Sequence, residues 1–322
     1  MSEHTNNISD NSDNTPAFEQ ALVSQIAKDF LREQRRSRRW GIFFKLLLTL
    51  YLFSFLALYL AKDFEITSLG GGMHTALVDI NGIIAVDSQA SADHVITGIR
   101  AAFENDKTAG IILRINSPGG SPVQAGYIND EINRLQAKHP DIPVYAVIRD
   151  LCASGGYYIA SAADKIYADK ASIVGSIGVI MSGFGFVDAI EKLGVERRLL
   201  QAGENKDFMD PFSPLKQADI QHIDTLLADI HQQFIDVVKE GRGDRLVDDD
   251  KLFSGLIWTG EQAIELGLVD ELGSSSYVAR EVIGVEDIVD FTYRENYLDR
   301  FADSLGAAML KHFNSMIKMQ LK

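Results

Sequence analysis

The sequence predicts an α/β domain that is preceded by one membrane-spanning helix. Three observations indicate this: an apolar run over residues 41–61, strand and helix patterns that alternate from residue 74 onward, and an amphipathic helix over 215–239. The 322 residues are 46% hydrophobic and 24% charged, which is typical of a folded globular protein. A formal net charge of -14 disfavours nucleic acid as a partner, and the single cysteine excludes an internal disulfide.

A polar segment precedes the apolar run. We expect residues 1–39 to form a flexible cytoplasmic tail whose last part, 28–39, is a collar rich in arginine. The transmembrane anchor is predicted over residues 40–61, because its apolar part, 41–61, rises about 31 Å as a helix, close to the thickness of a bilayer core. Trp40 suits the near interface, and Lys45 can extend back to the headgroups.

The distribution of charge predicts the orientation of this anchor. The positive-inside rule places the collar in the cytoplasm and the residues after Lys62 outside it, in the periplasm of a Gram-negative cell. Residues 1–45 carry a net charge of +1, and the remainder carries -15. A cleaved signal peptide is the alternative, but it expects a shorter apolar run and a small-x-small cleavage site. We therefore expect a single-pass protein of the inner (plasma) membrane with an extracytoplasmic domain.

After a linker at 62–73, the domain is expected to extend over residues 74–297. Short apolar runs predict strands at 74–86, 109–115, 143–148, 165–169 and 195–201. Apolar residues at helical spacing predict helices at 91–105, 121–138, 154–163 and 215–239. The last segment, 298–322, has apolar residues at every fourth position and is predicted to be an amphipathic helix. It would pack on its own domain, on another subunit or on a membrane surface.

Two glycine-rich turns each connect a predicted strand to a predicted helix. In INSPGGS, Gly119 and Gly120 would let the backbone approach a ligand and direct N–H groups outward, as an oxyanion hole requires, although an ordinary turn has the same pattern. In DLCASGGYY, Ser154 would lie at a helix N-terminus, where N–H groups favour negative charge, or would serve only as the N-cap. Cys152 is expected to be a small buried hydrophobic side chain.

A serine nucleophile needs a base. None of the histidines lies in a glycine-rich loop; they are His4, His74, His94, His139, His222, His231 and His312. A lysine can replace histidine where burial lowers the lysine pKa. Lys206 lies in a third loop, QAGENKD, but its spacing alone does not distinguish it from a solvated surface lysine.

In combination, these motifs resemble the signal peptide peptidase A family in its short, single-repeat form. The resemblance runs from about residue 75 to Gly273 and rests on four motifs in order: SPGG, ASGGYYIA, GSIGVIM at 175–181, and the Gly-x-x-Lys-Asp loop. It implies a ClpP/crotonase-like spiral fold, with no metal, nucleotide or other cofactor.

The resemblance also implies roles for particular residues. It assigns the nucleophile, the lysine-orienting hydroxyl and the general base to Ser154, Ser176 and Lys206. Backbone N–H groups of Gly155 and of either Gly119 or Gly120 would form the oxyanion hole. Asp207, beside the lysine, is expected to be structural.

The implied activity is that of a serine endopeptidase with a Ser-Lys dyad and an acyl-enzyme intermediate. Its substrates would be remnant signal peptides in the membrane, and also misfolded membrane or exported proteins. The family assembles into homo-oligomeric rings, so the lysine can come from an adjacent subunit.

Other functions would share some of these features. A SohB-like or stomatin-linked membrane protease would have the same motifs. A crotonase-like acyl-CoA enzyme would share the fold, but it would need basic residues for nucleotide phosphates in a domain that carries -15. A non-catalytic membrane scaffold would not need Ser154, Ser176 and Lys206 together.

Overall fold

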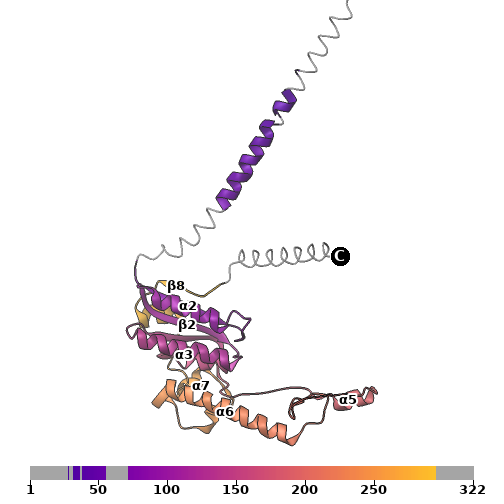
Figure 1. Ribbon diagram of the computed structural model, residues 1–322. Coiled ribbons are helices and arrows are strands. Elements are labelled where there is room, and N and C mark those ends of the chain that lie inside the picture. The colour runs from indigo at the N-terminus through magenta and orange to yellow at the C-terminus, as the bar shows by residue number, and fades with distance from the viewer. Residues whose placement is uncertain (1–27, 29–31, 37, 56–71, 295–322) are drawn as a thin grey trace, which may run out of the picture. The chain divides into compact units, whose positions relative to one another are not determined.

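The computed structural model describes residues 28, 32–36, 38–55 and 72–294 (Figure 1). The chain divides into two compact units, Met1–Gly71 and Gly72–Lys322. In the first unit, residues 38–55 are helical and their large apolar side chains are exposed. No helix among the described residues is both long enough and apolar enough to cross a membrane.

Several predicted segments lie outside the described residues. They are the tail over 1–27, the end of the predicted anchor at 56–61, the linker to residue 71, and the C-terminal amphipathic helix at 298–322. The predicted anchor is therefore described only over its first part, residues 40–55.

An eight-stranded sheet forms the centre of the second unit. Its strands are β1 (His74–Asn81), β2 (Thr108–Ser117), β3 (Val144–Ala153), β4 (Lys165–Ala168), β5 (Ile173–Gly175), β6 (Ile257–Thr259), β7 (Glu271–Leu272) and β8 (Ile288–Asp290). The main order is β6-β5-β3-β2-β1-β8, and β4 pairs with β3 and β7. All pairs are parallel except β5 with β6. The predicted α/β class is confirmed.

Helices follow the strands and cover the sheet. They are α2 (Ala92–Glu104), α3 (Pro122–Lys138), α4 (Gly155–Ala160), α5 (Val187–Lys192), α6 (Gln217–Arg242), α7 (Gly260–Glu265) and α8 (Ser275–Tyr277), with 3-10 turns at Gly243–Arg245 and Asp250–Phe253 and a π-helical turn at Val278–Ile283. Alternate strand residues face two separate cores. Val78 and Leu113 belong to the larger core with residues of α2, α3 and α6, whereas Leu77 and Ile112 pack with Val278.

Strand β3 changes partner along its length. Its first half pairs with β4, in the register Tyr145↔Lys165, and its last residues pair with β5, in the register Ala153↔Gly175. The end of β5 therefore lies beside the end of β3, where the ASGG turn begins.

The predicted strand at 195–201 is wrong: these residues form no regular secondary structure. They belong to a segment between β5 and α6, residues 179–216, in which no residue is buried. We call this segment the arm. It includes the short helix α5, which lies well away from the sheet (Figure 1). A strand needs a neighbouring strand to pair its backbone, and the arm offers none. The first predicted strand also ends early, at Asn81, because Gly82 turns the chain with φ of 87°.

Candidate active site

Ser154 occupies a strained turn between β3 and α4. Its φ and ψ are 51° and -123°, a conformation that costs a non-glycine residue on the order of 1–3 kcal/mol and is concentrated at functional sites. Ser154 holds the N-cap position of α4, but its side chain makes no capping hydrogen bond. The observed geometry thus does not support the simple N-cap alternative, and it leaves the partly exposed hydroxyl available for another partner.

The SPGG loop packs directly against this turn. A Cβ on Gly119 would lie 2.7 Å from both Ser154 Cβ and Gly155 N, so only glycine fits there. The Gly119 N–H donates to Ser117 Oγ at 3.1 Å. Within the described part of the chain, no acceptor takes the N–H of the exposed Gly120. A Cβ on Gly155 would lie 3.4 Å from Gly120 N, so these two residues are close neighbours.

Ser176 follows β5 as Ser154 follows β3. The Ser154 N–H donates to the Gly175 carbonyl at 2.8 Å, and the Ser176 N–H donates to the Leu256 carbonyl at 2.7 Å. Ser176 also has a positive φ, 55°. The structure therefore brings Ser154 and Ser176 to neighbouring strand ends, each in a strained backbone conformation.

An aromatic ring lies against this junction. A Cβ on Gly175 would lie 2.7 Å from two ring carbons of Trp258, which belongs to β6. Glycine at position 175 thus lets the indole pack directly on the backbone that precedes Ser176.

Lys206 lies in the arm, away from the two serines. It is exposed, its N–H donates to the Gly203 carbonyl at 3.2 Å, and no hydrogen bond or ion pair joins it to Ser154 or Ser176 within the described residues. A single chain therefore brings together the predicted nucleophile, the predicted orienting hydroxyl and the glycine loop, but not the predicted base.

The arm has its own internal contacts. Asp207 accepts a hydrogen bond of 2.6 Å from Lys216, which lowers the pKa of Asp207 and fits the predicted structural role. Arg197 pairs with Asp210 at 3.2 Å and lies over the ring of Phe212. These contacts fix the loop and cover most of the Asp207 and Asp210 side chains, but they leave Lys206 exposed.

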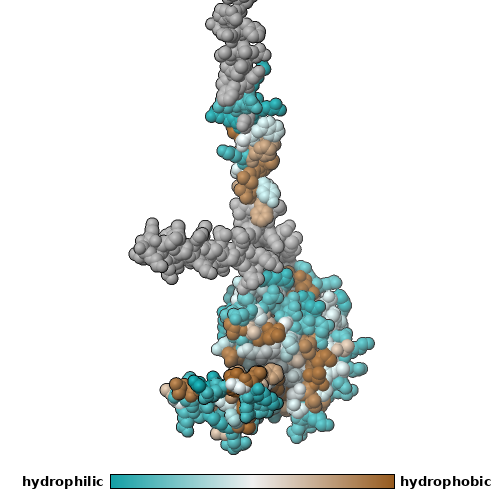
Figure 2. Space-filling view, turned by 90° about the vertical axis from the view of Figure 1, so that its right-hand side faces the viewer, coloured by the Kyte–Doolittle hydropathy of each residue, from teal (hydrophilic) through white to brown (hydrophobic). Residues whose placement is uncertain are grey.

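Large apolar side chains are exposed along the arm. They are Ile180, Met181, Phe184, Phe186, Leu193, Val195, Leu199, Leu200, Phe212 and Leu215. Figure 2 looks at the face from which the arm projects and shows further brown, hydrophobic patches on it. So much exposed apolar surface is typical of a protein–protein contact.

Cys152 is fully buried two residues before Ser154. Burial raises the pKa of its thiol well above the ordinary range, so the thiolate that a nucleophile requires is disfavoured. The prediction that Cys152 is a buried hydrophobic side chain is confirmed.

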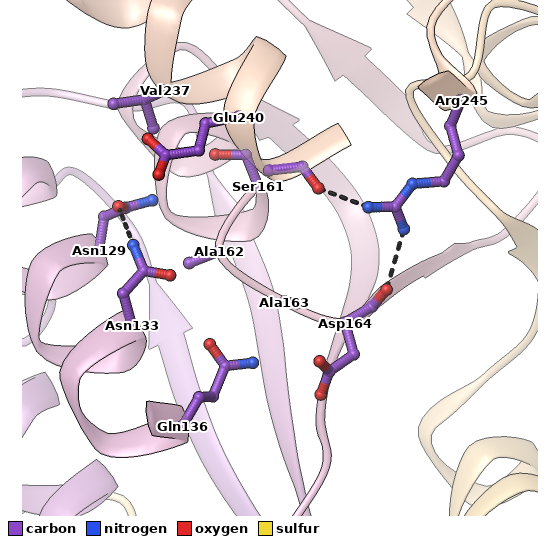
Figure 3. A pocket seen from close by; sticks show the side chains of 11 residues that line it. Asn129, Asn133, Gln136, Ser161, Ala162, Ala163, Asp164, Val237, Glu240 and Arg245 are labelled. Carbon is purple, nitrogen blue, oxygen red and sulfur yellow. Dashed lines mark hydrogen bonds between the residues drawn. The ribbon is translucent and has the colours of Figure 1, made fainter. Parts of the chain in front are cut away.

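A polar cavity of about 330 Å³ lies between α3, the end of α4 and α6 (Figure 3). Asn129, Gln136, Asp164, Glu240 and Arg245 are among the residues that line it. None of the predicted site residues lines this cavity. Arg245, in the 3-10 turn that follows α6, donates to the Asp164 carbonyl at 2.9 Å and so connects this turn to the segment after α4.

One residue near the site was not predicted. His231 of α6 places its Nε2 3.3 Å from the carbonyl oxygen of Ile177, the residue after Ser176. The contact joins residues 54 positions apart, and no local motif marks it.

Comparison with known proteins relates the sequence to a peptidase family. The sequence model of peptidase family S49 matches residues 136–286. One relative, named as a protease, is from Synechocystis sp. It is 33% identical over 199 residues, which are 62% of this chain and 69% of that protein. An Enterococcus faecium protein named as a signal peptide peptidase SppA is 33% identical over 206 residues, 62% of this chain and 59% of its own length.

A further relative is named as a Na⁺/H⁺ antiporter, NhaA, of Brucella melitensis. It is 41% identical over 222 residues, which are 69% of this chain and 29% of that protein. The chain thus spans less than a third of the Brucella relative and less than two thirds of the Enterococcus relative.

Proposed function

Because the chain belongs to peptidase family S49, we propose that it is a serine peptidase with Ser154 as its nucleophile and Lys206 as its general base. The observation that carries the proposal is the strained turn at Ser154. The hydroxyl of Ser154 makes no helix-capping hydrogen bond, and it lies beside Ser176 and the glycine loop. A hydroxyl held in this way, next to unpaired N–H groups, suits attack on a carbonyl.

The proposed reaction proceeds through an acyl-enzyme. Ser154 Oγ attacks the scissile carbonyl carbon while its proton passes to Lys206 Nζ, and Ser176 orients that amine. The oxyanion accepts hydrogen bonds from Gly120 N–H and Gly155 N–H, since Gly119 N–H is already used by Ser117. The C–N bond then breaks, the amine leaves with the proton from Lys206, and water hydrolyses the ester.

We place Lys206 of one subunit beside Ser154 of another. A lysine acts as a base where burial lowers its pKa, and the exposed arm needs a neighbour to cover it. The apolar side chains along the arm support a homo-oligomeric ring built through this segment. Each active site would then contain residues of two chains.

The dyad is tested by cleavage of a signal-peptide-like substrate in detergent. We expect Ser154→Ala and Lys206→Ala to abolish cleavage, while Ser182→Ala and Lys192→Ala, at exposed arm positions, leave it unchanged. Mixing the two inactive variants should restore activity at about a quarter of the sites if the dyad forms between chains. Full activity of either dyad variant in an intact assembly would refute the assignment.

We further propose that the substrates are remnant signal peptides, together with misfolded membrane or exported proteins. The resemblance of the motifs and the name of the Enterococcus relative support this. A membrane anchor at 40–61, with the N-terminus in the cytoplasm, would place the peptidase domain beside such substrates in the inner membrane. A reporter fused after Lys322 should then be active outside the cytoplasm, and a cytoplasmic signal would overturn this orientation.

A further inference from the structure

We infer that His231 is a positioning residue for Ser176, an inference that rests on the proposed serine–lysine mechanism. Its Nε2 lies 3.3 Å from the Ile177 carbonyl oxygen. Because a carbonyl oxygen can only accept, Nε2 carries the hydrogen in this contact. His231 is partly buried in the middle of α6, and it reaches the backbone directly after Ser176.

The peptide between Ile177 and Gly178, which contains the carbonyl that His231 contacts, lies just before the arm. Leu256 accepts the Ser176 N–H on one side of Ser176, and His231 holds the Ile177 carbonyl on the other. The Ile177 side chain is fully buried, whereas no residue from Gly178 to the end of the arm is buried. His231 thus holds the last buried residue before the arm.

The helix that carries His231 is itself fixed near the nucleophile. Phe234, three residues further along α6, is buried, and its ring packs on Tyr158 with ring centroids 5.1 Å apart. Tyr158 belongs to α4, the helix that begins immediately after Ser154. His231 therefore connects the Ser176 segment to an element that is already packed against the nucleophile turn.

This attachment has a consequence for catalysis. Ser176 has a φ of 55°, which its surroundings must maintain against relaxation. Without His231, the peptide between Ile177 and Gly178 can rotate. That peptide lies one residue beyond Ser176, so the backbone at Ser176 loses a fixed neighbour and its hydroxyl loses the direction in which it would orient the lysine amine. Proton transfer from Ser154 would slow, while the surface that binds the peptide substrate would be unchanged. We expect kcat to fall and KM to stay constant.

The test uses the rate constant at which a fluorophosphonate labels Ser154. In that reaction Ser154 Oγ forms a bond to phosphorus, fluoride leaves, and Lys206 receives the proton. A rate constant, unlike a labelled amount, does not depend on the folded fraction. His231→Leu removes the donor and should slow labelling about fivefold, which is the loss expected for one hydrogen bond. His231→Gln keeps an N–H near the same position and should restore most of the rate. Gln233→Ala, exposed on the same helix, is the control.

Two results would overturn the inference. One is a wild-type labelling rate for His231→Leu. The other is equally slow labelling of His231→Gln and His231→Leu at equal thermal midpoints. If His231→Leu does not fold, His231→Asn replaces it, because its shorter side chain cannot reach the Ile177 carbonyl. Failure of the dyad is separately visible: Ser154→Ala or Lys206→Ala would then keep peptidase activity, whereas failure of the inference alone leaves both variants inactive.

Discussion

Ser154 and Lys206 lie in two regions of different construction. Ser154 follows a strand of the sheet, and the residues immediately before it, Cys152 and Ala153, are buried. Lys206 lies in the arm, where no residue is buried and where ion pairs and aromatic contacts hold the loop. The sheet therefore fixes the backbone of the proposed nucleophile within one chain, whereas the proposed base lies in a segment that a single chain leaves exposed.

Replacement of residues 179–216 by a short Gly-Ser linker should separate folding from activity. The deletion removes no buried residue, so we expect the thermal midpoint of the remaining domain to change little. Peptidase activity should fall by at least about a thousandfold, because the proposed base is lost. Circular dichroism and substrate cleavage measure the two effects. A shortened protein that retains cleavage would show that the base lies in the sheet region.

Replacement of three glycines by alanine should lower the free energy of unfolding more at the glycine loop beside Ser154 than in the arm. Gly119→Ala places Cβ 2.7 Å from Ser154 Cβ at a φ of 97°, and we expect a loss of about 2–3 kcal/mol in the free energy of unfolding. Gly203→Ala in the arm has a similar φ but meets only the flexible Lys206 side chain, so the loss should be about 1 kcal/mol. Gly126→Ala in α3 meets no atom and should be stabilising. Denaturant unfolding checks the order.

Acid should lower the stability of the domain through Glu131, which lies on α3. Its carboxylate accepts hydrogen bonds from Arg134 and Arg100, which lower its pKa from 4.5 to about 2. Because the folded pKa is depressed, this stabilisation is fully present above pH 4.5 and is lost as the pH falls toward 2. Glu131→Gln should lower the thermal midpoint at pH 7, and the difference from the wild type should shrink as the pH falls through about 2. Glu104→Gln, at an exposed position, should follow the wild-type profile.

The smallest effect is expected for Lys216→Ala. Its ion pair with Asp207 at 2.6 Å lies on an exposed surface, where such pairs contribute little to stability. The thermal midpoint should be unchanged. Activity should fall measurably, but far less than in Lys206→Ala, because the loop beside the base loosens. An activity as low as that of Lys206→Ala would contradict the proposed dyad by assigning the catalytic amine to Lys216.

The regions that were predictable from sequence are those that the core determines. Apolar periodicity located the strands and helices of the sheet region because burial imposes it, and the glycine turns followed from the strand–helix alternation. The arm was not predictable in this way. Val195 to Gln201 has the apolar character of a strand, but these residues are exposed and pair with no strand among the described residues. Strand β5, three residues long, is too short to show a period.

Two details of the site could not be predicted from the sequence. The choice between Gly119 and Gly120 depends on the Ser117 hydroxyl, which takes one of the two N–H groups. The contact of His231 depends on the packing of α6 against α4. Neither hydrogen bond leaves a pattern in the sequence, because each depends on where a side chain points after folding.

The packing of Trp258 on Gly175 gives the protein an internal optical probe. The chain has only two tryptophans, Trp40 and Trp258, and a Trp40→Phe variant would leave a single indole next to the Ser176 strand end. Its emission would report changes in polarity at the junction of sheet and arm. Assembly of the subunits and arrival of a peptide could then be followed by fluorescence in real time, without a label or a cleavable substrate.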